Sequence, residues 1–293
     1  MTNMEENSDK IDKGALEEAL KTKYMGRKIF LYEQLDSTNA QAKRIIKGET
    51  EEGTAKGYNI DLQMVPQDSL HGALVLTEEQ TAGRGRLGRD WSSPKRGGIW
   101  MSFLLKPSLP VNSCPMLTLV AAVAVNAAIR KVTGLDSFIK WPNDIVINGK
   151  KVCGILTEAM GLSNEELNIV IGIGINANRK EFPEELRQSA TSLSLEKGCN
   201  INRNLLIAET CSSLERYYEE FEGQGDLSLL KEEYEKYLIN KGKQVRVLAT
   251  EGEYLGRALG INEQGALMVE GVEKEIHTIV SGEVSVRGVL GYI

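Results

Sequence analysis

The stretch Asp144-Ile-Val-Ile-Asn-Gly-Lys-Lys-Val-Cys-Gly-Ile-Leu-Thr-Glu158 places the pair Asn148-Gly149 between two apolar runs. An Asn-Gly pair in this setting predicts a two-residue β-hairpin, because both residues adopt positive φ easily. A polar segment at 161–166 then leads to a third apolar run at 167–176. Three consecutive strands joined in this way predict an antiparallel meander, which disfavours a doubly wound parallel sheet.

Further periodic segments extend this plan along the chain. Apolar runs or a period of two predict strands, and a period near 3.6 predicts helices. The result is an α+β fold, with strands at 28–34, 73–77 and 98–105 and helices at 14–24, 40–46, 115–132, 204–221 and 227–238. Residues 1–13 are polar and partly acidic, and we expect them to be disordered.

After residue 240 the pattern changes to short strands separated by glycine-containing turns. Five such strands, at 244–249, 254–261, 266–269, 274–279 and 283–287, predict a small β-barrel. The predicted organisation is therefore an N-terminal tail with a short helix at 1–27, a main domain at 28–241 and a barrel at 242–293.

The composition excludes several classes of protein. A net charge of −6 argues against nucleic-acid binding driven by overall charge. Four cysteines without a C-x-x-C pair indicate free thiols in a reducing compartment, hence the cytoplasm. With two histidines, a His-built metal site or a Ser/His/Asp triad is not expected. The N-terminus lacks a signal peptide pattern, and the apolar run at 116–129 is predicted to be a core helix rather than a membrane span.

Gln80-Thr-Ala-Gly-Arg-Gly-Arg-Leu-Gly-Arg-Asp-Trp91 alternates three arginines with three glycines between Gly83 and Arg89. Glycine lets the backbone approach an anion, and arginine offers a planar fork of donors to it. The string also matches G-x-G-x-x-G, but the loop residues that follow it argue against a dinucleotide-binding turn. Taken alone, this segment is either a site for a small anionic group or an exposed basic loop, such as those that bind RNA.

A second string, Lys140-Trp-Pro-Asn-Asp144, places a lysine at the end of a predicted strand. Pro142 interrupts the pairing of that strand. Alone, this pattern is more typical of a turn that carries a solvated lysine.

Both strings, followed by Lys151-Val-Cys-Gly-Ile-Leu-Thr-Glu158 and Gly172-Ile-Gly-Ile-Asn176, resemble the biotin–protein ligases, also called biotin–[acetyl-CoA-carboxylase] ligases. Asp36-Ser-Thr-Asn39, Thr191-Ser-Leu193 and Gly282-Glu-Val-Ser-Val-Arg287 also match motifs of that family. The resemblance implies a catalytic domain related to class II aminoacyl-tRNA synthetases, followed by an SH3-like barrel. It further implies that biotin and ATP form biotinyl-5′-AMP and that biotin then passes to a lysine of a biotin carboxyl carrier domain.

The resemblance implies that Lys140, Arg84 and Arg86 carry the catalysis. Adenylation brings a carboxylate against an α-phosphate, and cations must screen the repulsion between them. Leu87 stands where some members of the family have a further arginine. The glycines of the loop would let it close over the intermediate and exclude water.

Other positions are implied to bind biotin or ATP. Short or planar polar side chains near residue 38 suit the ureido ring of biotin, although Ser37 is also a candidate helix N-cap. Trp91 either folds over the ligand or belongs to the core. The binding residues are then Ser37, Thr38, Asn39, Gln80, Gly83, Arg84, Gly85, Arg86, Arg89, Trp91, Lys140, Asn143, Gly154, Asn176 and Arg287.

We also expect Glu283 and Arg287 to assist the ATP and carrier steps, with an exposed ion pair as the alternative. The expected small molecules are biotin and ATP with its Mg²⁺, without a certain protein metal site. The expected partner is the carrier domain of a biotin-dependent carboxylase; neither DNA nor a membrane is expected, and a homodimer is allowed. The short N-terminus predicts a form that lacks the DNA-binding domain of some bacterial members.

The alternatives are a lipoate–protein ligase, which shares the adenylate chemistry, and a nucleic-acid-binding protein that uses the basic loop.

Overall fold

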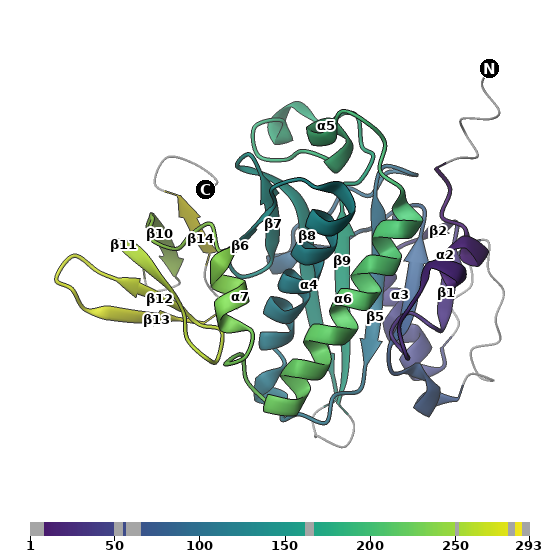
Figure 1. The fold of residues 1–293 in the computed structure, drawn as a ribbon, viewed down its shortest axis with the longest axis horizontal. Coiled ribbons are helices and arrows are strands. Elements are labelled where there is room, and N and C mark those ends of the chain that lie inside the picture. The colour runs from purple at the N-terminus through teal and green to yellow at the C-terminus, as the bar shows by residue number, and fades with distance from the viewer. Residues whose placement is uncertain are drawn as a thin grey trace.

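The computed structural model describes residues 9–49, 55–56, 66–161, 167–249, 252–280 and 285–288. Its larger part is built on a seven-stranded mixed sheet in the order β1-β4-β5-β9-β8-β7-β6 (Figure 1). All neighbouring pairs in this sheet are antiparallel except β1 and β4. The strands are β1 (Ile29–Tyr32), β4 (Ala73–Thr77), β5 (Ile99–Leu105), β6 (Phe138–Lys140), β7 (Asp144–Ile147), β8 (Lys150–Met160) and β9 (Asn168–Ile175).

The predicted meander is confirmed. Asn148 and Gly149 join β7 to β8 with φ values of 48° and 80°, as a tight hairpin requires. β8 then pairs along its length with β9, from Cys153 opposite Ile175 to Met160 opposite Asn168. The α+β class is therefore confirmed, while the parallel pairing of β1 with β4 is an addition that the sequence pattern did not indicate.

Helices cover both faces of the sheet. α4 (Met116–Thr133) and α6 (Arg203–Gln224) lie together on one face, and α3 (Thr38–Lys47) packs on the other (Figure 1). β4 shows why: Leu74 and Leu76 belong to the core under α4 and α6, whereas Ala73 and Val75 belong to the core under α3. Successive side chains of a strand point to opposite faces, so a sheet covered on both sides reads as a continuous apolar run.

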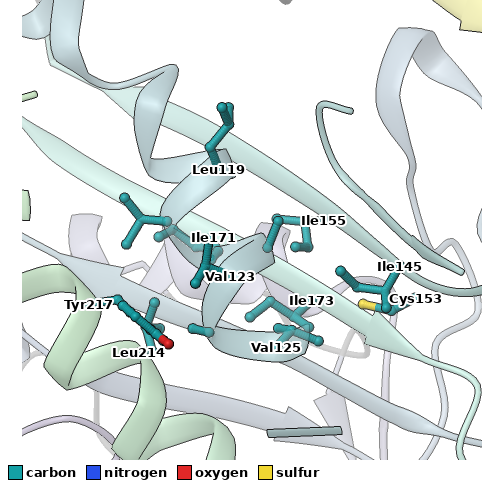
Figure 2. Packing of buried hydrophobic residues seen from close by; sticks show 14 of the residues in the cluster. Leu119, Val123, Val125, Ile145, Cys153, Ile155, Ile171, Ile173, Leu214 and Tyr217 are labelled. Carbon is teal, nitrogen blue, oxygen red and sulfur yellow. The ribbon is translucent and has the colours of Figure 1, made fainter. Parts of the chain in front are cut away.

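The larger core lies between α4 and the central strands. Leu119, Val123 and Val125 of α4 pack toward Ile171 and Ile173 of β9 (Figure 2). In the described part of the chain α4 is the one helix that is long and apolar enough to cross a membrane, and 72% of it is buried inside the protein. Its placement agrees with the prediction of a core helix.

The N-terminal segment differs from its prediction. Residues 9–13 are ordered rather than disordered, because Ile11 is 1% exposed and packs into the larger core. α2 (Lys13–Ala19) follows, with Asp12 as its N-cap, and is shorter than the predicted helix at 14–24. Residues 1–8 lie outside the described part of the chain.

Shorter elements complete the larger part. α7 is also shorter than predicted, because 227–230 form turns before it begins. These elements are β2 (Gln34–Leu35), β3 (Ala55–Lys56), α5 (Leu193–Lys197), α7 (Lys231–Lys236) and the 3₁₀ turns η2 (Gln67–Leu70), η3 (Arg86–Gly88), η4 (Val111–Ser113) and η5 (Glu184–Leu186).

A second, antiparallel sheet of five strands follows, in the order β13-β12-β11-β10-β14. It lies at one end of the molecule beside α7 (Figure 1). Its strands are β10 (Gln244–Ala249), β11 (Gly252–Ile261), β12 (Leu267–Glu270), β13 (Ile276–Ile279) and β14 (Ser285–Gly288), close to the five predicted. Trp141 links the two parts: its backbone N–H donates to Asn240 Oδ1 at 2.9 Å, and its indole N–H donates to the Gly265 carbonyl at 3.0 Å.

Candidate functional site

A set of glycines opens a pocket on the α3 face of the sheet. Gly172 and Gly174 of β9 and Gly154 of β8 stand at positions where alternation would otherwise place side chains on that face. A Cβ on Gly172 would overlap Asn39, and a Cβ on Gly174 would overlap the Trp91 ring. The glycines therefore let these two side chains lie directly against the strands.

One end of this pocket is a connected polar network. Gln80 Oε1 accepts from the Thr38 backbone N–H at 2.9 Å, and Gln80 Nε2 donates to Ser93 Oγ at 2.6 Å. Ser102 Oγ of β5 lies 2.8 Å from Thr38 Oγ1 and 2.6 Å from Asn39 Oδ1. Sequence reasoning missed Ser102 and Ser93, although Ser102 interrupts the apolar run of β5.

Two further groups extend the network. Asn39 Nδ2 donates to Glu158 Oε2 at 2.7 Å, and Lys43 Nζ pairs with Glu158 Oε1 at 2.5 Å. Ser37 occupies the N-cap position of α3, as predicted, but its hydroxyl makes no capping bond to any described residue. Because Ser37 also lines the pocket, its side chain is available to a ligand.

Two cavities meet at the Arg/Gly loop. The smaller, of about 50 Å³, holds the polar network and the glycines, and the larger, of about 260 Å³, extends toward β14. Five residues line both cavities and so define their junction: Gly85, Arg86, Trp91, Asn143 and Lys151.

Arg86 is held at the junction by Asn143. Its Nη1 donates to Asn143 Oδ1 at 3.0 Å, and Asn143 Nδ2 in turn donates to the Ile155 carbonyl at 3.0 Å. Burial lowers the pKa of the Arg86 guanidinium, and the nearby Asp144 carboxylate opposes this effect. A partly desolvated guanidinium interacts more strongly with an anion than one in open water does.

Trp91 covers the glycines between the two cavities. Its indole Nε1 is buried and donates to none of the residues that the structure describes. Lys151 Nζ lies 5.0 Å from the ring centroid, which is a cation–π distance. Trp91 thus lies in the site rather than in the core, and Lys151 is a site residue that sequence reasoning missed even though it begins the Lys151–Glu158 motif.

Lys140 is not a solvated surface lysine. It ends β6, is 5% exposed, and lines the larger cavity together with Asp144, its partner across the β6–β7 pair. The following peptide, Trp141-Pro142, is cis. Lys140 therefore lies at the cavity that Arg86 also lines.

The remaining loop residues divide between the cavities. Arg84 lines the smaller cavity, Arg89 lines the larger, and Gly83 lies beneath the loop against the Trp91 carbonyl. Leu87 is 60% exposed and has a φ of 57°. Arg86 is the half-buried arginine of the loop, whereas Arg84, Leu87 and Arg89 line the cavities from exposed positions.

Asn176 lines the larger cavity. It is 3% exposed, and its Nδ2 donates to the Thr191 carbonyl at 3.2 Å. Its Oδ1 is buried and accepts no hydrogen bond within the described ranges. Phe182, over which the Arg179 guanidinium lies at 4.5 Å, lines the same cavity. A flat ring that carries an N–H donor would satisfy both features.

The C-terminal sheet contributes Val286 to the larger cavity. Arg287 is opposite Arg246 in the β10–β14 pair, but its side chain is outside the described part of the structure, as is the whole of Glu283. The roles assigned to these two residues stay predictions.

Comparison with known proteins agrees with this geometry. Residues 57–176 match the model of the Biotin/lipoate A/B protein ligase family, and residues 242–287 match the Biotin protein ligase C terminal domain. The "Bifunctional ligase/repressor BirA" of Bacillus subtilis (strain 168) is 37% identical over 263 residues, which are 89% of this chain and 75% of the relative. The "Biotin--[acetyl-CoA-carboxylase] ligase" of Mycobacterium tuberculosis is 30% identical over 207 residues, 69% of this chain and 74% of the relative.

The fold has a solved counterpart of similar length. The structure described as "Biotin protein ligase from Aquifex aeolicus in complex with biotin and ATP" has a TM-score of 0.72 and 30% identity to this chain. The match covers 89% of this chain and 99% of that one.

Proposed function

The chain belongs to the biotin protein ligase family, and we propose that it activates biotin with ATP to biotinyl-5′-AMP and then transfers biotin to a lysine of a biotin carboxyl carrier domain. One observation carries this proposal. A small pocket with a polar end opens into a larger cavity at a junction lined by Arg86 and Lys151, next to Lys140.

The smaller pocket fits biotin in one direction. The ureido ring needs both donors and acceptors, which the network of Thr38, Asn39 and Gln80 supplies. The apolar chain would then run over Gly172 and Gly174 beneath Trp91. In this orientation the carboxylate of biotin would lie at the junction of the two cavities, beside Arg86 and Lys151.

The same pocket distinguishes biotin from lipoate. A dithiolane ring offers no strong donor or acceptor, so it would displace water from the polar end of the pocket without replacing the hydrogen bonds of that water. An unpaired buried polar group costs about 1–3 kcal/mol. The polar end of the pocket therefore favours the biotin ligase over the lipoate ligase.

ATP would occupy the larger cavity, with its base near Phe182 and Asn176 and its α-phosphate at the junction. Lys140 and Arg86 would stabilise the charge that builds up as the two anions approach. Mg²⁺ enters as the Mg·ATP substrate, and no group of three His, Cys, Asp or Glu side chains in the described residues is placed to hold a metal of its own. Water is kept from the mixed anhydride by Trp91 and the Arg/Gly loop.

The finer features of the fold belong to the same proposal. We assign residues 28–241 to a catalytic domain related to class II synthetases and 242–293 to an SH3-like barrel, supported by the mixed sheet and the five antiparallel strands. Val286 at the cavity supports a part for the barrel in the ATP step. A cytoplasmic location and the absence of DNA binding are predictions, and a homodimer is allowed.

The test is release of pyrophosphate from Mg·ATP by the purified chain with biotin alone, without a carrier domain. We expect release with biotin and about five- to 150-fold less with lipoate, since losing the ureido bonds costs about 1–3 kcal/mol. Labelled biotin should then appear on a carrier domain that keeps its lysine and not on its Lys-to-Arg variant. No release without the carrier would overturn the two-step scheme.

A further inference from the structure

A buried ion pair lies beside the site without touching either cavity. Arg203, the first residue of α6, donates from Nη1 to Glu78 Oε2 at 2.8 Å, and the two side chains are 1% and 4% exposed. Taking two charges out of water is costly, and hydrophobic residues of similar volume would often be as stable. A pair buried this deeply therefore suggests a need for one defined geometry at this point.

The N-terminal segment completes the ion pair. The Ile11 backbone N–H donates to Glu78 Oε1 at 2.7 Å, Arg203 Nε donates to Asp9 Oδ1 at 3.1 Å, and Arg203 Nη2 contacts the Asp9 carbonyl. These contacts join three segments that are far apart in the sequence. We call their four residues the loop clamp: Asp9, Ile11, Glu78 and Arg203.

The loop clamp holds both ends of the segment that carries the Arg/Gly loop. At one end the Glu78 carbonyl accepts from the Arg96 backbone N–H at 3.1 Å. At the other, Arg203 Nη1 donates to the Gly98 carbonyl at 3.0 Å. Residues 79–97, including the whole loop and Trp91, thus leave and re-enter the fold at one fixed point.

Glu78 also lies two residues before Gln80. The Gln80 side chain bonds Thr38 and Ser93, so the polar end of the small pocket is built directly on this strand end. A displacement at Glu78 would be transmitted to Gln80 through one intervening residue. No member of the loop clamp is among the residues that line the two cavities in the described structure.

We propose that Glu78 and Arg203 are positioning residues for ligand binding: their buried pair, locked by Asp9 and Ile11, fixes the ends of the Arg/Gly loop and the place of Gln80. The proposal rests on the proposed function for its ligand. It explains why two charges are buried at the base of a loop that must close over an intermediate.

The test is Glu78→Gln in the full chain, which keeps the shape but removes the charge. We expect the KM for biotin in pyrophosphate release to rise about tenfold, because small misplacements of binding groups cost ten- to hundredfold. Trypsin should also cleave faster after the loop arginines, both without ligand and with biotin and Mg·ATP bound. A role confined to stability would lower the melting temperature and leave the KM unchanged while the protein is folded.

Glu215→Gln is the matched control. Glu215 lies on the same helix, is also buried, and also binds backbone N–H groups of the N-terminal region, at Lys23, Tyr24 and Met25, but away from the loop. Its KM for biotin and its loop cleavage should stay within about twofold of wild type, as for a site without coupling to the ligand.

Equal effects of Glu78→Gln and Glu215→Gln on both measurements would overturn the proposal. If Glu78→Gln does not fold, Asp9→Ala removes one outer arm of the loop clamp and should show the same changes to a smaller extent; unchanged KM and cleavage in that variant would also overturn it. A wild-type chain that makes no biotinyl-AMP would refute the proposed function instead, and the cleavage of unliganded protein would still test the loop clamp.

Discussion

Lys151 Nζ lies 2.5 Å from Asp144 Oδ1, and the two side chains lie together on the wall of the larger cavity. A carboxylate at this place would repel the phosphates of ATP. The lysine offsets that charge, and its position over the Trp91 ring also ties the strand β8 to the residue that covers the small pocket.

Lys151→Met should therefore weaken ATP binding more than biotin binding. Loss of a charged hydrogen-bonding partner costs about 1.5–3 kcal/mol, so we expect the KM for ATP to rise about ten- to hundredfold. The measurement is pyrophosphate release at saturating biotin. Lys150→Met, at the neighbouring position of β8, is the control, and equal KM values for both variants would show that the pair has no part in ATP binding.

Adding Asp144→Asn to Lys151→Met tests the cause. If the defect comes from the uncompensated carboxylate, the double variant should bind ATP better than Lys151→Met alone. No recovery would indicate that Lys151 contacts the nucleotide itself.

Lys140→Met should reduce the adenylation rate at least about a hundredfold, since a charge aimed at the developing negative charge is worth roughly 2.7–4 kcal/mol. Methionine keeps the apolar stem of a side chain that is 5% exposed, so the fold should survive. Single-turnover formation of biotinyl-AMP measures this step. Transfer from preformed biotinyl-AMP should be less affected, because the two anions have already met; adenylation near the wild-type rate would contradict the central role of Lys140.

The sequence predicted those features that depend on neighbours in the chain. The Asn148-Gly149 hairpin is local, and the alternation in β9 that brings Gly172 and Gly174 to one face follows from the period of a strand. The site residues could be placed together because their strings resemble a family, not because spacing revealed it.

Contacts between distant segments were not predictable in this way. Glu78 and Arg203 are 125 positions apart, and nothing in either local pattern indicates the other. The order of residues 9–13 has the same origin. This polar segment contains one isoleucine, and it is ordered because Ile11 packs into the larger core and its backbone N–H donates to the distant Glu78. Lys151 was missed because a lysine beside a hairpin turn is typical of a solvated strand end.

Glu215 should make stability depend on pH. Burial opposes its ionisation, but hydrogen bonds from the backbone N–H groups of Met25, Tyr24 and Lys23 hold the pKa of its carboxyl below the ordinary value. A carboxyl with a lowered folded pKa contributes stability above its unfolded pKa of about 4.3, and that contribution is lost as the pH falls through the folded pKa. Glu215→Gln should therefore lower the free energy of unfolding at pH 7 by about 1–3 kcal/mol, the usual cost of losing bonds to a charged group. Urea unfolding should show the difference from wild type shrinking below pH 4; a constant difference would contradict the linkage.

Arg86→Ala should weaken retention of biotinyl-AMP more than binding of biotin. Its guanidinium is fixed by Asn143 at the junction of the cavities, where the acyl phosphate would lie, rather than at the ureido end. Losing a charge-assisted bond of about 1.5–3 kcal/mol should speed adenylate release about ten- to hundredfold. Stopped-flow displacement of biotinyl-AMP gives its release rate, and titration with biotin alone gives the affinity for biotin. Lys95→Ala, at an exposed position in the same segment, is the control.

Asn143→Ala should change the release rate and the biotin affinity in the same direction as Arg86→Ala, since it removes the acceptor that orients Arg86. Equal losses for both ligands would mean that Arg86 binds substrate and intermediate alike and does not favour the intermediate.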